Sequence, residues 1–321
     1  MDSWHFALTQ SDLPGAGCFQ ATYPSTQWAR IDCSAPPPHH FYPVPRSKQQ
    51  ALGQTVGGGR DFTADTSPHL MSKAIGAFPN VKGVRSVRSV GCCGVQGLNS
   101  YTLQLNSQFF PTPACGSITY CGGWEQFVFE NPSHKRKGFL FIESWLVPMP
   151  IQRGHLSGCP PSGNWIYVGI GCYQNSQAVR IPNISVKDLG QLIETGRASP
   201  NGDSIYLSFG TTEYGMRNIQ SDGVVDLVDN WTGAEFNIVG DAGGDVANFN
   251  AGSTITVSIQ TDTGLTKKPA CPANTGTTGE TNNLFFVEAP KNPPQLRYPS
   301  VEFTMSSSST GAVSCDTVRG R

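Results

Sequence analysis

The sequence predicts an all-β fold, a two-sheet antiparallel β-sandwich of the jelly-roll or concanavalin-like kind. The 321 residues include 36 glycines and 24 prolines, and only 14% of them are charged. That composition is typical of proteins built from strands and turns. From about residue 99, short segments rich in β-branched and aromatic residues alternate with Gly, Pro, Asn and Asp. This alternation indicates a series of strands joined by turns.

The strand-rich region contains eight segments with this signal, at 101–110, 124–130, 138–147, 165–173, 204–209, 234–239, 253–260 and 284–288. One further segment, 186–195 (VKDLGQLIET), has the character of a short helix that Gly190 interrupts. We therefore expect strands almost throughout, with a single short helix.

The first part of the chain has a different composition. It carries a proline run at 36–38, a glycine cluster at 57–59 and few alternating segments. Such stretches favour extended structure. We expect residues 1–95 to form an extended N-terminal arm or pro-segment, and residues 96–321 to form the β-sandwich domain. If the arm is a cleaved pro-segment, Arg85 and Arg88 are candidate cleavage sites.

The ten cysteines favour disulfides over a metal site, because they form neither a CxxC pair nor a Cys/His cluster at zinc spacing. Their spacing suggests the pairs Cys18–Cys33, Cys115–Cys121, Cys159–Cys172 and Cys271–Cys315, although spacing alone leaves the connectivity open. The neighbours Cys92 and Cys93 are not expected to bond to each other, because adjacent residues fit disulfide geometry badly.

Disulfides indicate an oxidising compartment, so we expect a secreted, extracellular protein. The start, MDSWHFALTQ, has no apolar signal core, which suggests that a signal peptide has been removed. The chain has no apolar run long enough to cross a membrane. Its formal net charge of −1 predicts neither a nucleic-acid partner nor binding to an acidic membrane. We expect a monomer.

Familiar catalytic motifs are absent from the sequence. It has no G-x-S-x-G, H-E-x-x-H, P-loop or dinucleotide fingerprint. His39 and His40 have no third ligand near them in sequence, so an exposed loop is the simpler interpretation. Asp241 and Asp245 flank a glycine-rich turn, but two carboxylates are too few for a calcium cage. We expect no metal and no cofactor.

Carboxylates and amides on predicted strands remain as candidates. In the segment AEFNIV (234–239), alternation places Glu235 and Asn237 on the face opposite Phe236 and Ile238. An acidic side chain among aromatic residues can have a raised pKa, which suits acid–base chemistry at low pH.

Two other strands carry comparable groups. Gln126 shares a face with Trp124, and Glu143 lies between Phe141 and Trp145 on one face. For each of these residues the alternative is an ordinary cross-strand partner on a sheet. The aromatic neighbours make Gln126 and Glu143 the better candidates for a site.

The segments WEQFVF, FIESWLV and AEFNIV resemble, in this order, strands of the glutamic peptidase (eqolisin) superfamily, which includes the neprosin group. The resemblance implies a secreted, acid-active endopeptidase with two curved sheets and a catalytic Glu and Gln on the concave face. The A-E-F match assigns the Glu to Glu235. Gln126 is the best match to the Gln, with Gln104 and Gln108 as alternatives. In the neprosin pattern, Cys121 stands where the first catalytic acid belongs.

The resemblance also implies roles. Glu235 would activate a water and later protonate the leaving amine, and Gln126 would orient the water and stabilise the oxyanion. Trp124, Glu143 and Trp145 would line the cleft for a polypeptide substrate. The alternative is a non-catalytic secreted sandwich that binds glycan or protein on its concave face, where an exposed Trp124 and Trp145 would suit sugar stacking.

Overall fold

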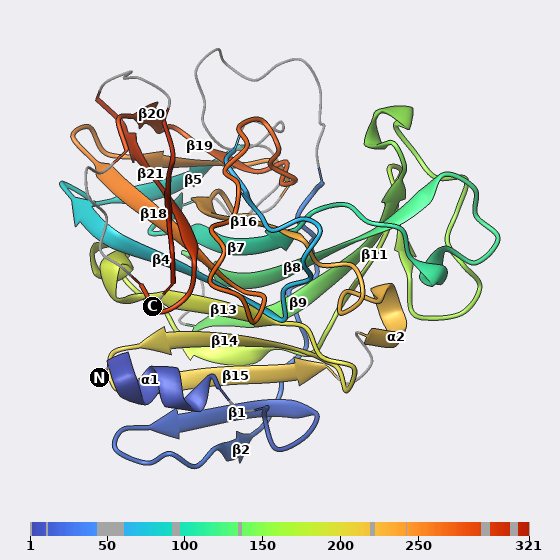
Figure 1. Ribbon diagram of the computed structural model, residues 1–321, viewed down its shortest axis with the longest axis horizontal. Coiled ribbons are helices and arrows are strands. Elements are labelled where there is room, and N and C mark those ends of the chain that lie inside the picture. The colour runs from blue at the N-terminus through green and yellow to red at the C-terminus, as the bar shows by residue number, and fades with distance from the viewer. Residues whose placement is uncertain are drawn as a thin grey trace.

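Two large antiparallel sheets pack face to face in the computed structural model, as the predicted β-sandwich requires (Figure 1). The structure describes residues 2–10, 12–43, 61–91, 97–133, 137–218, 222–241, 243–289, 296–308 and 314–320. Within these ranges the larger sheet has ten strands, the second has eight, and a small third sheet has four.

The ten-stranded sheet contains most of the C-terminal half of the chain together with β1, β2 and β4. Its order is β2 (Ala29–Ile31), β1 (Gly17–Thr22), β15 (Thr212–Asn218), β14 (Asp203–Phe209), β13 (Ile193–Arg197), β4 (Lys73–Lys82), β18 (Thr254–Asp262), β21 (Ser300–Ser306) and β20 (Phe285–Val287), with β22 (Asp316–Val318) also paired to β21.

The eight-stranded sheet carries the segments singled out in the sequence. Its order is β10 (Ile166–Tyr167), β11 (Cys172–Asn175), β9 (Lys137–Pro148), β8 (Cys121–Asn131), β7 (Tyr101–Ser107), β16 (Gly233–Val239) and β3 (Ala64–Asp65), with β12 (Val179–Pro182) also paired to β9. The small sheet has the order β19 (Thr281–Asn282), β17 (Val246–Phe249), β5 (Val87–Val90) and β6 (Gly97–Leu98).

Helices are few and short in the described ranges. They are α1 (Asp2–Leu8), α2 (Asp222–Val225) and three 3-10 helices at Pro113–Cys115, Ile151–Arg153 and Val186–Gln191. The helix expected at 186–195 is thus a 3-10 helix, and β13 begins at Ile193, within the predicted segment. The predicted strand at 165–173 is wrong in its extent, because a turn divides it into β10 and β11.

The core lies between the two large sheets, and strand alternation fills it. Phe236 and Ile238 of β16 and Phe127 of β8 are completely buried there. Gly76 of β4 and Gly196 of β13 face them, and a Cβ atom at either glycine would overlap the ring of Phe236 or Phe127. Glycine is required at these two positions because the aromatic rings lie directly against the opposite backbone.

The described parts of residues 1–95 differ from the extended arm that their composition suggested. β4 lies inside the ten-stranded sheet between β13 and β18, and β1 pairs with β15 along its whole length. Alternation in β4 is weak, with Gly76, Pro79 and Asn80 inside it, so its strand signal was easily missed. Residues 38–43 are in none of these strands and contact the eight-stranded sheet, where the Phe41 amide donates to Glu143 of β9.

All four disulfides suggested by cysteine spacing are present, namely Cys18–Cys33, Cys115–Cys121, Cys159–Cys172 and Cys271–Cys315. Cys92 and Cys93 lie outside the described residues. In the described ranges, no helix has both the length and the apolar character that crossing a bilayer would need.

Candidate functional site

A row of polar side chains crosses the eight-stranded sheet on the face turned away from the core, which we call the concave face. In register, Glu235 of β16 lies opposite Asn106 of β7, Asn106 opposite Gln126 of β8, and Gln126 opposite Glu143 of β9. All four are at least 99% buried. We call these four residues the polar row. Four neighbouring strands thus place buried carboxyl and amide groups on one line.

Residues 38–43, which we call the strap, lie over this face. The amide of Phe41 donates to Glu143 Oε1 at 2.8 Å. The Gln126 amide has two orientations. In one its nitrogen donates to Asn106 Oδ1 at 3.1 Å and to Gln104 Oε1 at 3.4 Å. In the turned orientation, which needs the Asn106 amide to turn as well, its nitrogen donates to the Phe41 carbonyl at 3.2 Å and to Glu143 Oε1 at 3.0 Å. The next amide, that of Tyr42, donates to Glu280 Oε1 at 2.9 Å. Side chains of the site therefore hold both polar groups of the Phe41–Tyr42 peptide unit.

The side chain of Phe41 is completely buried in an apolar pocket. Its lining is Val128, Phe139, Phe141 and Ala178, and the ring of Phe141 lies 6.3 Å from that of Phe41. The strap thus contacts the concave face both through its backbone and through a side chain in a fitted pocket.

Trp124 and Trp145 lie beside the polar row and have no exposed surface. The Trp145 indole donates to Glu143 Oε1 at 2.7 Å, while His40 and Tyr42 of the strap pack on its ring at 5.6 and 6.3 Å. The surface-exposed position that sugar stacking would need is therefore not found for either tryptophan.

The loop 275–280, which we call the covering loop, packs against Glu235 and donates hydrogen bonds to its carboxylate. Its Oε2 accepts from the Thr277 amide at 2.6 Å, the Thr277 hydroxyl at 2.9 Å, the Thr278 amide at 3.1 Å and the Asn106 side chain at 3.3 Å. The Glu235 carboxyl also shares a side-chain hydrogen bond with the carboxyl of Asp61. Gly276 allows this close approach, because a Cβ atom there would lie 2.8 Å from Oε1.

Three further carboxyl groups at the site have pKa values raised chiefly by burial. They belong to Asp61, Glu143 and Glu280. For Asp61 the charge of nearby Glu235 raises the pKa further. Hydrogen bonds from the Trp145 indole and the Phe41 amide oppose the rise at Glu143. The site therefore favours neutral carboxylic acids around Glu235.

The contacts of Thr278 agree with a protonated Glu280. The Thr278 hydroxyl lies 2.8 Å from Glu280 Oε2 and 2.6 Å from Gln104 Oε1. A hydroxyl carries one proton, so it can donate to only one of these oxygens. A proton on Glu280 Oε2 supplies the second hydrogen bond.

The structure brings Gln126, Glu143, Trp124 and Trp145 together, as the sequence suggested, and it places Glu235 on the same face but two strands from Gln126. Asn106 lies between them. Of the alternatives to Gln126, Gln104 is on the concave face next to Thr278. Gln108 instead holds the turn before β16 through Asn230 and Gly233.

Sequence reasoning missed Asn106, Asp61, Glu280 and the covering loop. Alternation along 101–107 does place Asn106 on the face of Gln104, so that residue could have been found. Asp61 and Glu280 lie outside the predicted strands and reach the site only through the path of the chain in three dimensions.

The same face carries a second group of side chains, His39 of the strap, Glu130 of β8 and Asp241 after β16. One potential ligand atom from each lies within 4.8 Å of the others. His39 thus has two potential ligands near it in space, which its neighbours in sequence did not indicate. Glu130 and Asp241 are distant in sequence, and only the folding of β8 beside β7 and β16 brings them near the strap.

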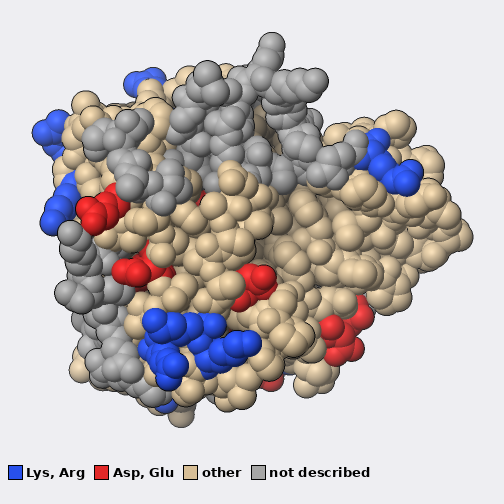
Figure 2. All heavy atoms as spheres, turned by 45° about the horizontal axis from the view of Figure 1, so that its top comes forward, with Lys and Arg blue, Asp and Glu red and all other residues tan. Residues whose placement is uncertain are grey.

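A groove of about 830 Å³ opens beside the strap rather than over Glu235. Its walls include Pro36, Pro38, Tyr173 and Asn175. Figure 2 shows charged side chains scattered in small groups on a largely uncharged surface. The carboxyl groups of the polar row are buried and do not contribute to that surface. In this structure the strap and the covering loop close the site.

No protein-family model matches the chain, and no curated protein sequence matches it.

Proposed function

We propose that the chain hydrolyses peptide bonds at acid pH, with Glu235 as general base and the Gln126 amide as oxyanion donor. The observation that carries this proposal is the Phe41–Tyr42 peptide unit. Its amide donates to Glu280 at 2.9 Å, and with the Gln126 amide in its turned orientation its carbonyl accepts from Gln126 at 3.2 Å. These contacts are those that a substrate backbone would need on the same face.

In the proposed reaction the attacking water lies above Asn106, between Gln126 and Glu235. Strands are about 4.8 Å apart, so the two residues are separated by about 10 Å at the backbone, and their long side chains point to one side. Glu235 Oε1 takes the proton of the water, which attacks the carbonyl carbon. Gln126 donates to the oxygen that becomes negative.

The leaving amine then needs a proton. Glu280 contacts the amide nitrogen that would leave, and its raised pKa favours the protonated form at acid pH. The resemblance to glutamic peptidases gives this step to Glu235. The geometry of the strap favours Glu280 instead.

The Phe41 pocket suggests the substrate preference. A large apolar residue on the acyl side of the cleaved bond would fill the space between Val128, Phe139 and Phe141. Because the strap already occupies this pocket, the full chain is expected to be latent until the strap moves. Secretion and four disulfides fit an enzyme that works outside the cell.

The test uses denatured casein at about pH 3–5, an acidic range in which the raised pKa of Glu280 favours its protonated form. Phe41→Ala empties the pocket without changing its lining, and we expect it to cleave casein faster than the wild type. Fragment sequencing should show large apolar residues before the cut. Adding Glu235→Gln to Phe41→Ala should lower the rate by about a hundredfold or more, the size expected for losing a general base.

The matched control adds Glu302→Gln to Phe41→Ala. Glu302 is a buried carboxyl of β21 in the other sheet, so its loss should leave cleavage unchanged. Equal cleavage with and without Glu235→Gln would remove Glu235 from the mechanism. An absence of cleavage by Phe41→Ala, with the fold intact by circular dichroism, would refute the hydrolase.

A further inference from the structure

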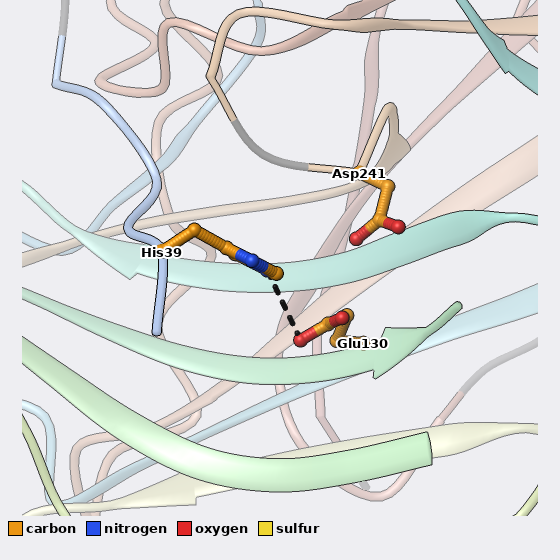
Figure 3. A group of neighbouring side chains, drawn as sticks. All are labelled: His39, Glu130 and Asp241. Atoms are coloured by element: carbon orange, nitrogen blue, oxygen red, sulfur yellow. Dashed lines mark ion pairs between the residues drawn. The ribbon is translucent and has the colours of Figure 1, made fainter. Parts of the chain in front are cut away.

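We propose that His39, Glu130 and Asp241 form a binding site for one divalent transition-metal ion, with Zn²⁺ as the best match, and that this ion fastens the strap to the concave face. Figure 3 shows the three side chains converging from the strap, from β8 and from the turn after β16. They are separate from the polar row that the proposed hydrolysis uses.

The three ligand atoms lie within 4.8 Å of one another, and one pair has the spacing of two ligands of one metal ion. His39 Nε2 lies 3.3 Å from Glu130 Oε2, but neither atom makes a hydrogen bond to a described residue. Zinc bonds to nitrogen and oxygen are about 2.0–2.2 Å long, so two ligands of a tetrahedral shell lie about 3.3–3.5 Å apart. The observed separation fits two ligands of one ion.

Glu130 is the strongest single indication. It has no exposed surface, and across the described part of the chain neither of its carboxylate oxygens accepts a hydrogen bond. His39 is its ion-pair partner among the described residues, and a buried carboxylate that accepts no hydrogen bond is costly. Thr102, opposite Glu130 on β7, also has a buried hydroxyl without a partner among the described residues. Both groups point to a ligand on this part of the face.

The charges of the three side chains are consistent with a divalent ion. Glu130 and Asp241 are both fully buried and together carry two negative charges when ionised. Of the described Lys, Arg and His side chains, only His39 lies within ion-pair distance of Glu130. One divalent cation would bring two positive charges to these two carboxylates, whereas a protonated His39 brings one.

The surroundings hold two of the ligands in place. The Ser100 hydroxyl donates to Asp241 Oδ2 at 2.8 Å, and the Ser89 hydroxyl accepts from the Asp241 amide at 3.0 Å. On the strap, the His39 carbonyl accepts from Asn175 at 3.4 Å, and its ring packs edge-on against Phe41 at 5.8 Å. Such supporting contacts orient ligands at metal sites.

The chemical types of the three ligands indicate which metal would bind. One imidazole nitrogen with two carboxylates suits zinc and its neighbours, whereas calcium and magnesium prefer oxygen ligands alone. Solvent would supply the fourth position of a tetrahedral shell. His39 is two residues before Phe41, so an ion here would hold the strap next to the peptide unit that contacts Gln126 and Glu280.

The experiment titrates Zn²⁺ into the full chain after dialysis against a chelator, by calorimetry. We expect one equivalent to bind. His39→Gln and Glu130→Gln should weaken binding by more than the 10–100-fold typical of losing a supporting contact. His40→Gln is the matched control, because His40 is the next strap residue but packs on Trp145 and Tyr173 instead. It should bind as the wild type does.

Hydrogen exchange provides the second measurement. The amides of Phe41 and Tyr42 should exchange faster after the chelator and slow again when Zn²⁺ is restored. Equal zinc binding by the wild type and His39→Gln, no stoichiometric binding by the wild type, or preferential binding of Ca²⁺ would overturn the site. Unchanged exchange with zinc bound would overturn the fastening of the strap. Asp241→Asn replaces Glu130→Gln if that variant does not fold. None of these readouts depends on peptidase activity.

Discussion

The two faces of the eight-stranded sheet are equally buried but differ in chemistry. On β8, Phe127 and Phe129 point into the core, while Gln126 and Glu130 point to the concave face, and none of the four has exposed surface. The first face is covered by the other large sheet. The second is covered by the strap and the covering loop, segments that belong to neither large sheet. A face covered by a second sheet becomes part of the hydrophobic core, whereas a face covered by loops can be uncovered when the loops move.

The largest expected effect comes from removing one phenylalanine from each of the two faces. Phe127→Ala should cost about 3–5 kcal/mol of unfolding free energy, because it leaves a cavity between two sheets that cannot collapse. Phe41→Ala, equally buried before mutation, should cost clearly less, because the strap can detach without opening the core. Urea denaturation of both variants measures the two values. Equal losses would mean that the strap is an integral part of the core.

A medium effect probes how tightly the covering loop lies on the polar row. Gly276→Ala would place a Cβ atom 2.7 Å from Asp61 Cβ and 2.8 Å from Glu235 Oε1. We expect a loss of about 1–3 kcal/mol, the usual cost of overpacking. Gly15→Ala is the control, since no atom lies within 4 Å of its added Cβ. Similar melting temperatures for the two variants would contradict a tightly packed loop.

The smallest expected effect is on how the stability of the folded protein changes with pH. The pKa values of Asp61, Glu143 and Glu280 are raised in the folded state. Their contribution to stability is therefore fully present below the unfolded pKa of about 4 and is lost as the pH rises through the folded values. The melting temperature should be higher at pH 4.5 than at pH 7.

Glu280→Gln removes one of these titrating groups and keeps the side-chain shape. It should shrink the difference in stability between the two pH values, because one group with a raised pKa no longer titrates. Thermal melts of both proteins in the same two buffers give the comparison. A steeper dependence in the variant would show that Glu280 is ionised in the folded protein.

The fold followed from the sequence where alternation was strong. Period-two patterns correctly predicted the faces of β8, β9 and β16, because one side of each strand faces an apolar core. The sequence did not predict β4, because Gly76 weakens its alternation. A glycine is needed there because the Phe236 ring of the other sheet packs against it, and the sequence alone does not show that contact.

The site could be predicted only in part for a related reason. Gln126, Glu143 and Glu235 lie on strands, so alternation indicated the neighbours of each within its own strand. That Glu235 and Gln126 share a face was an expectation from the resemblance, and the strand register places them so. Glu280, Asp61 and His39 come from segments without a regular period, and only their tertiary paths bring them to that face. Trp145 and Trp124 are buried because distant segments cover them: the strap packs on Trp145, and the Trp124 indole donates to Thr277 of the covering loop.

The pairing of β1 with β15 has a consequence for any proteolytic maturation of this protein. A single cut between residues 43 and 61 would not release a free pro-segment, because β1 would remain hydrogen-bonded to β15 over six residue pairs. No described disulfide would join the two pieces, since Cys18–Cys33 closes within the first of them. The product would be a two-chain protein held together by an intermolecular β-sheet, and the new chain end just after the strap would be free to leave the polar row.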